Sequence, residues 1–123
     1  MDEIEVGNLL GLMALADNRK PPEDNQARAV MIEFWLGMVG DLRYIDAAEA
    51  VRQHYRESRE WCMPADIRER VAQIRKQRVE AAPPVEIPEH LADRSVEARD
   101  WKQRTLQAIA DGADPQLAIG SGP

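Results

Sequence analysis

Cysteine, aromatic residues and long apolar runs are all scarce in this chain of 123 residues. The single cysteine, Cys62, excludes an internal disulfide and any zinc site with several cysteine ligands, and we expect it to be a small, partly buried apolar residue. Aromatic residues make up 5% of the chain, which favours helices because strands are rich in aromatic and β-branched residues. No apolar run approaches the roughly 20 residues that a membrane-spanning helix needs, and no signal peptide is visible. These absences predict a helical, cytoplasmic protein.

Motifs of catalytic and cofactor-binding sites are also missing. Neither His54 nor His90 has a second histidine or a cysteine close by at the spacing of known zinc ligands. Gly7 and Gly11 lie inside a helical pattern and do not form a phosphate-binding loop. The acidic residues are typical of exposed helix faces. We therefore predict a non-enzyme with no metal, no cofactor and no small-molecule substrate.

Helical periodicity is what the sequence does contain. Apolar residues recur three and four positions apart in segments that predict helices over 3–16, 23 or 25–39, 46–59 and 64–80. The second segment has an expected buried stripe of Ala27, Val30, Met31, Phe34, Trp35 and Met38. We expect Asp46 to cap the third helix together with Glu49, and Pro64 to open the fourth.

The composition changes after residue 82. Pro83, Pro84 and Pro88 predict an extended linker over residues 83–94. A short helix is expected from Ser95 to Ala110 with Ser95 as its cap, followed by a Gly-, Ala- and Pro-rich end that favours disorder. The predicted fold is all-α: a small four-helix N-terminal domain (1–82), a Pro-rich linker (83–94) and a short helix with a flexible tail (95–123).

Charge is distributed unevenly along the chain. The whole sequence has a net charge of −6, residues 1–51 carry −6, and residues 52–78 carry +4. The basic residues of the fourth helix are candidates for contact with DNA phosphates or an acidic protein, or they form an ordinary solvated face. They are Arg68, Arg75, Lys76 and Arg78.

Trp101 stands in a polar segment beyond the predicted linker. It could fold back onto the N-terminal helices, or it could anchor a partner, because buried aromatic anchors carry much of the binding energy of small interfaces. The candidate partner-binding residues of the tail are Trp101, Leu106, Ile109, Leu117 and Ile119.

Several residues in the first 80 positions also carry a family resemblance. They are Trp35, Asp41-Leu42-x-Tyr44, Ala47-Ala48-x-Ala50-Val51, His54-Tyr55 and Met63-Pro64-Ala65-Asp66-Ile67. In this order they resemble the N-terminal domain of the phage replicative-helicase loader/inhibitor family. Small replication-module proteins of actinobacteria and their phages are similar around Trp61-x-Met63-Pro64-Ala65-Asp66-Ile67-Arg68.

The resemblance implies a helical adaptor without catalytic residues, whose C-terminal part engages the hexameric replicative helicase. Our leading hypothesis is therefore a phage or prophage DNA-replication accessory protein in the cytoplasm of a bacterial host. Its folded domain would contact an origin-bound initiator or DNA, and its tail would contact the helicase. The alternative is a helix-turn-helix-like DNA-binding protein that uses the basic helix 64–80.

Overall fold

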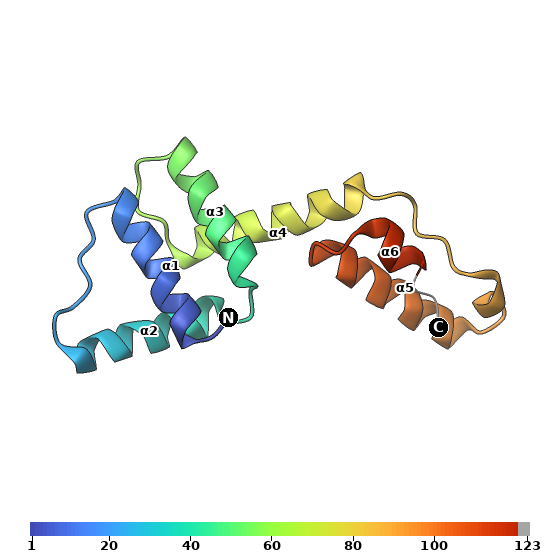
Figure 1. Ribbon diagram of the computed structural model, residues 1–123, viewed down its shortest axis with the longest axis horizontal. Coiled ribbons are helices and arrows are strands. Elements are labelled where there is room, and N and C mark those ends of the chain that lie inside the picture. Colours follow the sequence, from blue (N-terminus) through green and yellow to red (C-terminus); the bar gives the residue numbers. More distant parts are fainter. Residues whose placement is uncertain (121–123) are drawn as a thin grey trace. The chain divides into compact units, whose positions relative to one another are not determined.

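The computed structural model describes residues 1–120, and these residues form helices and connecting segments with no strand (Figure 1). The elements are α1 (Glu3–Ala16), α2 (Asn25–Val39), α3 (Tyr44–Glu57), α4 (Pro64–Ala81), the 3-10 helix η1 (Glu89–Leu91), α5 (Ser95–Ala110) and α6 (Pro115–Gly120). The prediction of an all-α protein is confirmed. Within the described part of the chain, no helix is both long enough and apolar enough to cross a membrane.

The helices group into two compact units. The first comprises Met1–Ala72 and the second begins at Gln73, so that the boundary falls inside α4. The proline pattern predicts this boundary later, after residue 82, and the four-helix layout of residues 1–82 is not confirmed. An extended linker over 83–94 is not confirmed either, because η1 lies in this segment and buries Leu91.

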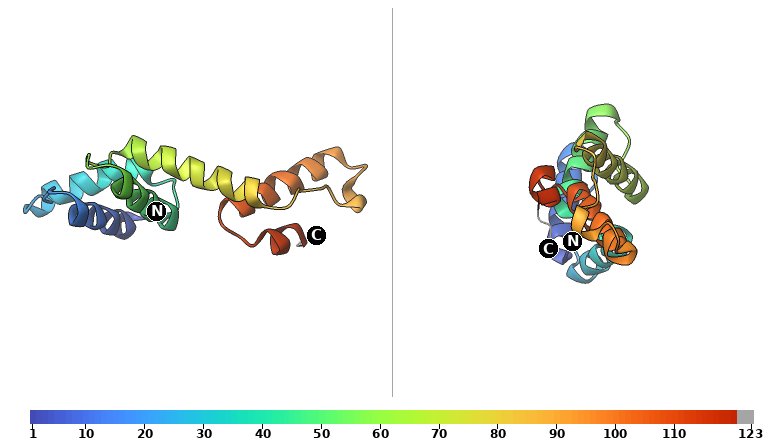
Figure 2. Two further views of the ribbon diagram at one scale, coloured as in Figure 1. Left: turned by 90° about the horizontal axis from the view of Figure 1, so that it is seen from above. Right: turned by 90° about the vertical axis from the view of Figure 1, so that its right-hand side faces the viewer.

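The first unit is organised around α1, which packs on both α2 and α3 (Figure 1, Figure 2). A capping box starts α1: the Asp2 carboxylate accepts the backbone N–H of Glu5 at 2.8 Å, and the Glu5 carboxylate accepts that of Asp2 at 3.1 Å. The apolar residues of the unit's core recur at helical spacing. They include Val6, Leu9, Met13, Val39, Ala47, Val51, Ile67 and Val71.

Only one edge of α2 is buried. Trp35 and Val39 are covered, whereas Val30, Phe34 and Met38 of the expected stripe are exposed, as is Ala27. The prediction for these four residues is wrong. The physical reason is that α1 packs along one side of α2, so a wide apolar stripe on α2 is only partly covered.

Two predicted helix caps are also wrong. Helix α3 begins at Tyr44 with Arg43 as N-cap, so Asp46 lies in the first turn, where it is buried. Helix α5 has Arg94 as N-cap, and Ser95 is its first residue. Helix α3 therefore starts before the residue that its sequence favours as a cap, and α5 starts at that residue.

The second unit buries the tryptophan of the tail. Trp101 packs with Leu91 and Ala98, and Val85 packs against this cluster. Helix α6 packs on α5 and occupies part of the segment for which composition predicts disorder, while residues 121–123 lie outside the described chain (Figure 2). Gly112 has φ +100°, a left-handed conformation that favours glycine, and it turns the chain after α5.

Candidate functional site

A groove of about 600 Å³ lies between α1 and α2 in the first unit. Mostly small residues of α1 form one wall, and larger apolar residues of α2 form the other. The wall residues are Gly7, Leu10, Gly11 and Ala14 from α1, and Met31, Ile32 and Trp35 from α2. A groove of this size is within the range of roughly 300–1,000 Å³ that is typical of ligand sites.

Two glycines keep the α1 wall open. A Cβ atom at Gly7 would lie 4.0 Å from Cδ1 of Ile32, which is ordinary van der Waals contact. A Cβ atom at Gly11 would meet nothing within 4 Å. Gly11 therefore faces open space, and a side chain placed there would enter the groove without a clash.

All the charged residues that line the groove in the described chain are basic: Arg19, Lys20 and Arg28. They belong to a segment, residues 1–51, whose net charge is −6. The Arg28 guanidinium donates to the carbonyl oxygen of Pro22 from Nε at 3.1 Å and from Nη2 at 2.9 Å. These bonds hold Arg28 beside the loop that follows α1.

Trp61 and Met63, from the loop between α3 and α4, complete the lining. The Trp61 side chain is 52% exposed, and Met63 is exposed to a similar degree. The Arg19 guanidinium carbon lies 4.9 Å from the centre of the Trp61 ring, within the range of a cation–π contact. The groove therefore has two large apolar side chains that are accessible from outside.

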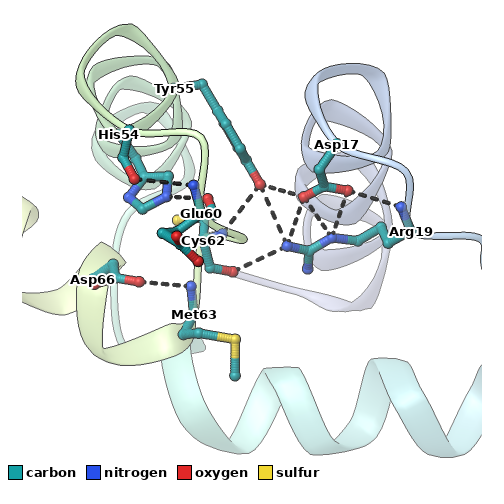
Figure 3. A network of polar contacts seen from close by, with 9 residues as sticks. Asp17, Arg19, His54, Tyr55, Glu60, Cys62, Met63 and Asp66 are labelled. Carbon is teal, nitrogen blue, oxygen red and sulfur yellow. Dashed lines mark hydrogen bonds and ion pairs between the residues drawn. The ribbon is translucent and has the colours of Figure 1, made fainter.

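A network of polar contacts fixes the loop that carries Trp61 and Met63 (Figure 3). The Asp17 carboxylate accepts the backbone N–H of Arg19 at 3.0 Å and its Nε–H at 2.9 and 3.0 Å. It also accepts a short hydrogen bond from the Tyr55 hydroxyl. The Tyr55 oxygen accepts the backbone N–H of Cys62 at 3.1 Å, and Arg19 Nη2 donates to the Cys62 carbonyl at 3.2 Å. The end of α1 is thereby tied to the loop at Cys62.

The network shifts the pKa values of its members. Burial acts to raise the pKa of Asp17, but hydrogen bonds from Arg19 and Tyr55 outweigh it and hold the pKa below its usual value. Burial and the bond to Asp17 raise the pKa of Tyr55. The carboxylate and the neutral phenol are therefore the stable forms near neutral pH.

Three residues with possible metal ligands meet beside this network. His54 at the end of α3, Cys62 in the loop and Asp66 in the first turn of α4 have ligand atoms within 4.8 Å of one another. Burial, followed by the charge of Asp66, raises the pKa of the Cys62 thiol to about 11. The sequence did not predict this cluster, because its three residues do not have the spacing of known metal-binding motifs. They come together only through the turn between α3 and α4.

The four predicted basic residues are engaged with groups of the chain itself. Arg68 donates to Asp41 at 2.6 and 3.0 Å, and Lys76 lies 3.8 Å from Glu80. Arg75 pairs with Asp111, and Arg78 donates to the carbonyl oxygen of Ala110 at 2.8 Å. Arg68 belongs to the first unit and the other three to the second. Contact with DNA would therefore compete with these interactions.

The five predicted tail residues differ in exposure. Trp101 is 4% exposed and Ile109 is buried, Leu106 and Ile119 are half-buried, and Leu117 is 72% exposed. Trp101 is covered by a cluster that belongs to the second unit itself. Of this set, Leu117 is the large side chain that the described structure leaves most accessible.

Comparisons with protein-family models, curated proteins and solved structures found no match to this chain. The resemblance of residues 1–80 to the helicase loader/inhibitor family therefore stays a hypothesis based on the residues quoted above. The features that bear most directly on function are the groove, its basic rim and the loop that carries Trp61 and Met63. The basic rim consists of Arg19, Lys20 and Arg28.

Proposed function

We propose that this chain is a non-enzymatic adaptor that binds an acidic amphipathic helix of a partner protein in the groove between α1 and α2. One observation carries this proposal: an apolar groove whose charged lining is entirely basic, within a segment that is otherwise acidic. The basic lining residues complement an acidic helix and disfavour a basic one.

The shape of the groove supports a helical occupant. Two helices form its walls, and apolar residues from both walls line it. An amphipathic helix can lay an apolar face with anchors at positions i, i+3, i+4 and i+7 into such a groove. Trp61 and Met63 would contact these anchors, since aromatic residues dominate binding energy and methionine adapts to irregular surfaces.

Lys20 and Arg28 provide most of the charge complementarity. The Arg19 guanidinium is already paired with Asp17 at 2.8 Å, which reduces its attraction for a partner carboxylate. Arg28 donates to a neutral carbonyl oxygen, which does not offset the positive charge of its side chain as a carboxylate would. Exposed charges at a rim mainly affect association rate and salt dependence, so binding should weaken as ionic strength rises.

The family resemblance supports the hexameric replicative helicase as the partner to test first. On this proposal the protein is a phage or prophage replication accessory factor, and the first unit provides the principal contact. Leu117 of the tail remains accessible for a further contact. An origin-bound initiator protein is the second partner to test, and it too would bind through an acidic amphipathic helix.

A pair of synthetic helices tests the groove in the full chain. The two peptides share one apolar face, and the polar face carries glutamate in one and lysine in the other. Calorimetry should show binding of the acidic helix and at least tenfold weaker binding of the basic one. The double variant Lys20→Glu/Arg28→Glu should reverse this preference, while Lys102→Glu/Arg104→Glu in the second unit serves as the control.

Other outcomes would contradict the proposal. Equal affinity for the two helices would show that the basic rim does not select the partner. If neither helix binds, the groove is not a helix-binding site. A parallel titration with duplex DNA tests the DNA-binding alternative. If DNA binds with a steep salt dependence that is lost when Arg68, Arg75, Lys76 and Arg78 all become Ala, while neither helix binds, the DNA-binding alternative replaces the adaptor. A pull-down with purified hexameric helicase then tests the partner's identity.

A further inference from the structure

The corner between α3 and α4 brings a histidine, a cysteine and a carboxylate together. His54 comes from the last turn of α3, Cys62 from the loop and Asp66 from the first turn of α4 (Figure 3). One ligand atom from each lies within 4.8 Å of the other two. His54 is 5% exposed, Cys62 is fully buried and Asp66 is half-buried.

We propose that His54, Cys62 and Asp66 bind a zinc ion that fixes the corner between α3 and α4. Imidazole, thiolate and carboxylate are the three ligand types of protein zinc sites, and a thiolate disfavours calcium and magnesium, which prefer oxygen. Three protein ligands leave the fourth tetrahedral position for a water molecule. The ion would hold the loop that carries Trp61 and Met63 of the groove lining, and its binding does not depend on a partner in the groove.

The distances suit a tetrahedral ion after a small movement. With bonds of about 2.0–2.3 Å to zinc, ligand atoms at tetrahedral angles lie about 3.3–3.8 Å apart. Ligand atoms within 4.8 Å of one another therefore need to approach by up to about 1.5 Å. Rotation of the half-buried Asp66 side chain can provide part of this movement.

Neighbouring hydrogen bonds orient the ligands. His54 Nε2 donates to the Glu60 carbonyl at 2.6 Å, which holds the ring against the loop. One Asp66 oxygen accepts the backbone N–H of Met63 at 2.9 Å, and the carboxylate has a second oxygen for the ion. Such outer contacts orient metal ligands and maintain their affinity.

The Cys62 sulfur is the second observation in favour of a ligand. It is fully buried, and within residues 1–120 it takes part in no hydrogen bond, although the backbone N–H and carbonyl of Cys62 are both bonded to the network around Tyr55 and Arg19. On binding, the S–H bond breaks, its proton passes to water and a zinc–sulfur bond forms, without any change of oxidation state.

Cobalt(II) is the probe, because it takes the tetrahedral geometry of zinc and reports thiolate ligation by its absorption. Titration of the purified full chain should produce a thiolate-to-cobalt charge-transfer band that saturates at one ion per chain. Excess zinc should displace the cobalt and bleach the band. Zinc should also raise the melting temperature, and a chelator should reverse this rise.

Two variants and one control make the test specific. Cys62→Ala keeps the backbone bonds of the network and should abolish the charge-transfer band. Asp66→Asn keeps a side-chain oxygen for the Met63 N–H and should weaken cobalt binding at least tenfold. The control His90→Gln, at the other histidine of the chain, should bind like the original protein.

The proposal is overturned by any of three results. The first is the absence of a charge-transfer band in the folded full chain. The second is a band that persists unchanged in Cys62→Ala. The third is equal cobalt affinity in Asp66→Asn and the original chain, which would be decisive even if Cys62→Ala failed to fold.

Discussion

Phe34 in the first unit is 62% exposed, whereas Trp101 in the second unit is 4% exposed. Phe34 lies in an apolar stripe, and Trp101 lies in a segment rich in charged residues. The difference arises from coverage: η1 and the start of α5 place Leu91 and Ala98 against Trp101, while α1 packs along the other side of α2. Whether an aromatic residue is core or surface therefore depends on which element packs against it, and this is why the first unit retains exposed apolar side chains on α2.

The largest effect is expected from Trp101→Ala. Truncation of a buried tryptophan lowers the free energy of unfolding by about 3–5 kcal/mol. A small unit with few other core residues has a low free energy of unfolding, so this loss should unfold it. We expect the amides of α5 to lose their protection from hydrogen exchange, while those of α1 keep theirs. Protection in α5 that stays unchanged would contradict the burial of Trp101.

A smaller effect is expected from Tyr55→Phe. The substitution removes the hydroxyl that links Asp17 to the backbone of Cys62, and leaving such buried partners unsatisfied costs about 1–3 kcal/mol. Denaturant unfolding of the variant measures this loss. Tyr44→Phe on the same helix is the control and should be close to neutral. Equal losses in both variants would show that the network does not stabilise the loop.

Acid should weaken the first unit through Asp17. Its pKa is lowered in the folded protein from an ordinary value of 3.8, so the stabilisation is complete above that value and is lost as pH falls through the folded-state pKa. The cause is that the unfolded chain takes up a proton on this carboxylate at a higher pH than the folded chain does. The free energy of unfolding, measured from about pH 6 to pH 2, should fall less steeply in Asp17→Asn than in the original chain. Parallel curves would contradict this assignment.

The smallest effect is expected from Phe34→Ser. Because this side chain is mostly exposed, the free energy of unfolding should change by no more than about 0.5 kcal/mol. Denaturant unfolding of Phe34→Ser and Trp101→Ala, measured in parallel, compares the two aromatic residues directly. A loss of several kcal/mol would mean that a further element or a second molecule covers α2.

Local signals in the sequence predicted the helices well. The predicted bounds of α1 and α5 agree with the structure, and Pro64 opens α4 as expected, because prolines and helical periodicity act over a few positions. What they could not predict is tertiary: which side of α2 is covered, where Trp101 packs, and that a turn brings His54 near Cys62. The groove was missed for the same reason, since Gly11 appears in the sequence as a weak helix residue and becomes an opening only when α2 lies beside it.

The most direct test of the docking groove is the affinity of Gly11→Leu for the acidic amphipathic helix. A leucine at Gly11 meets open space and fills the groove, and it should also stabilise α1, because glycine is a poor helix former. Gly37→Leu is the matched control, since Gly37 of α2 also meets nothing within 4 Å but does not line the groove. We expect binding at least tenfold weaker in Gly11→Leu and unchanged in Gly37→Leu. Undiminished binding by Gly11→Leu would contradict the assignment of the groove as the docking site.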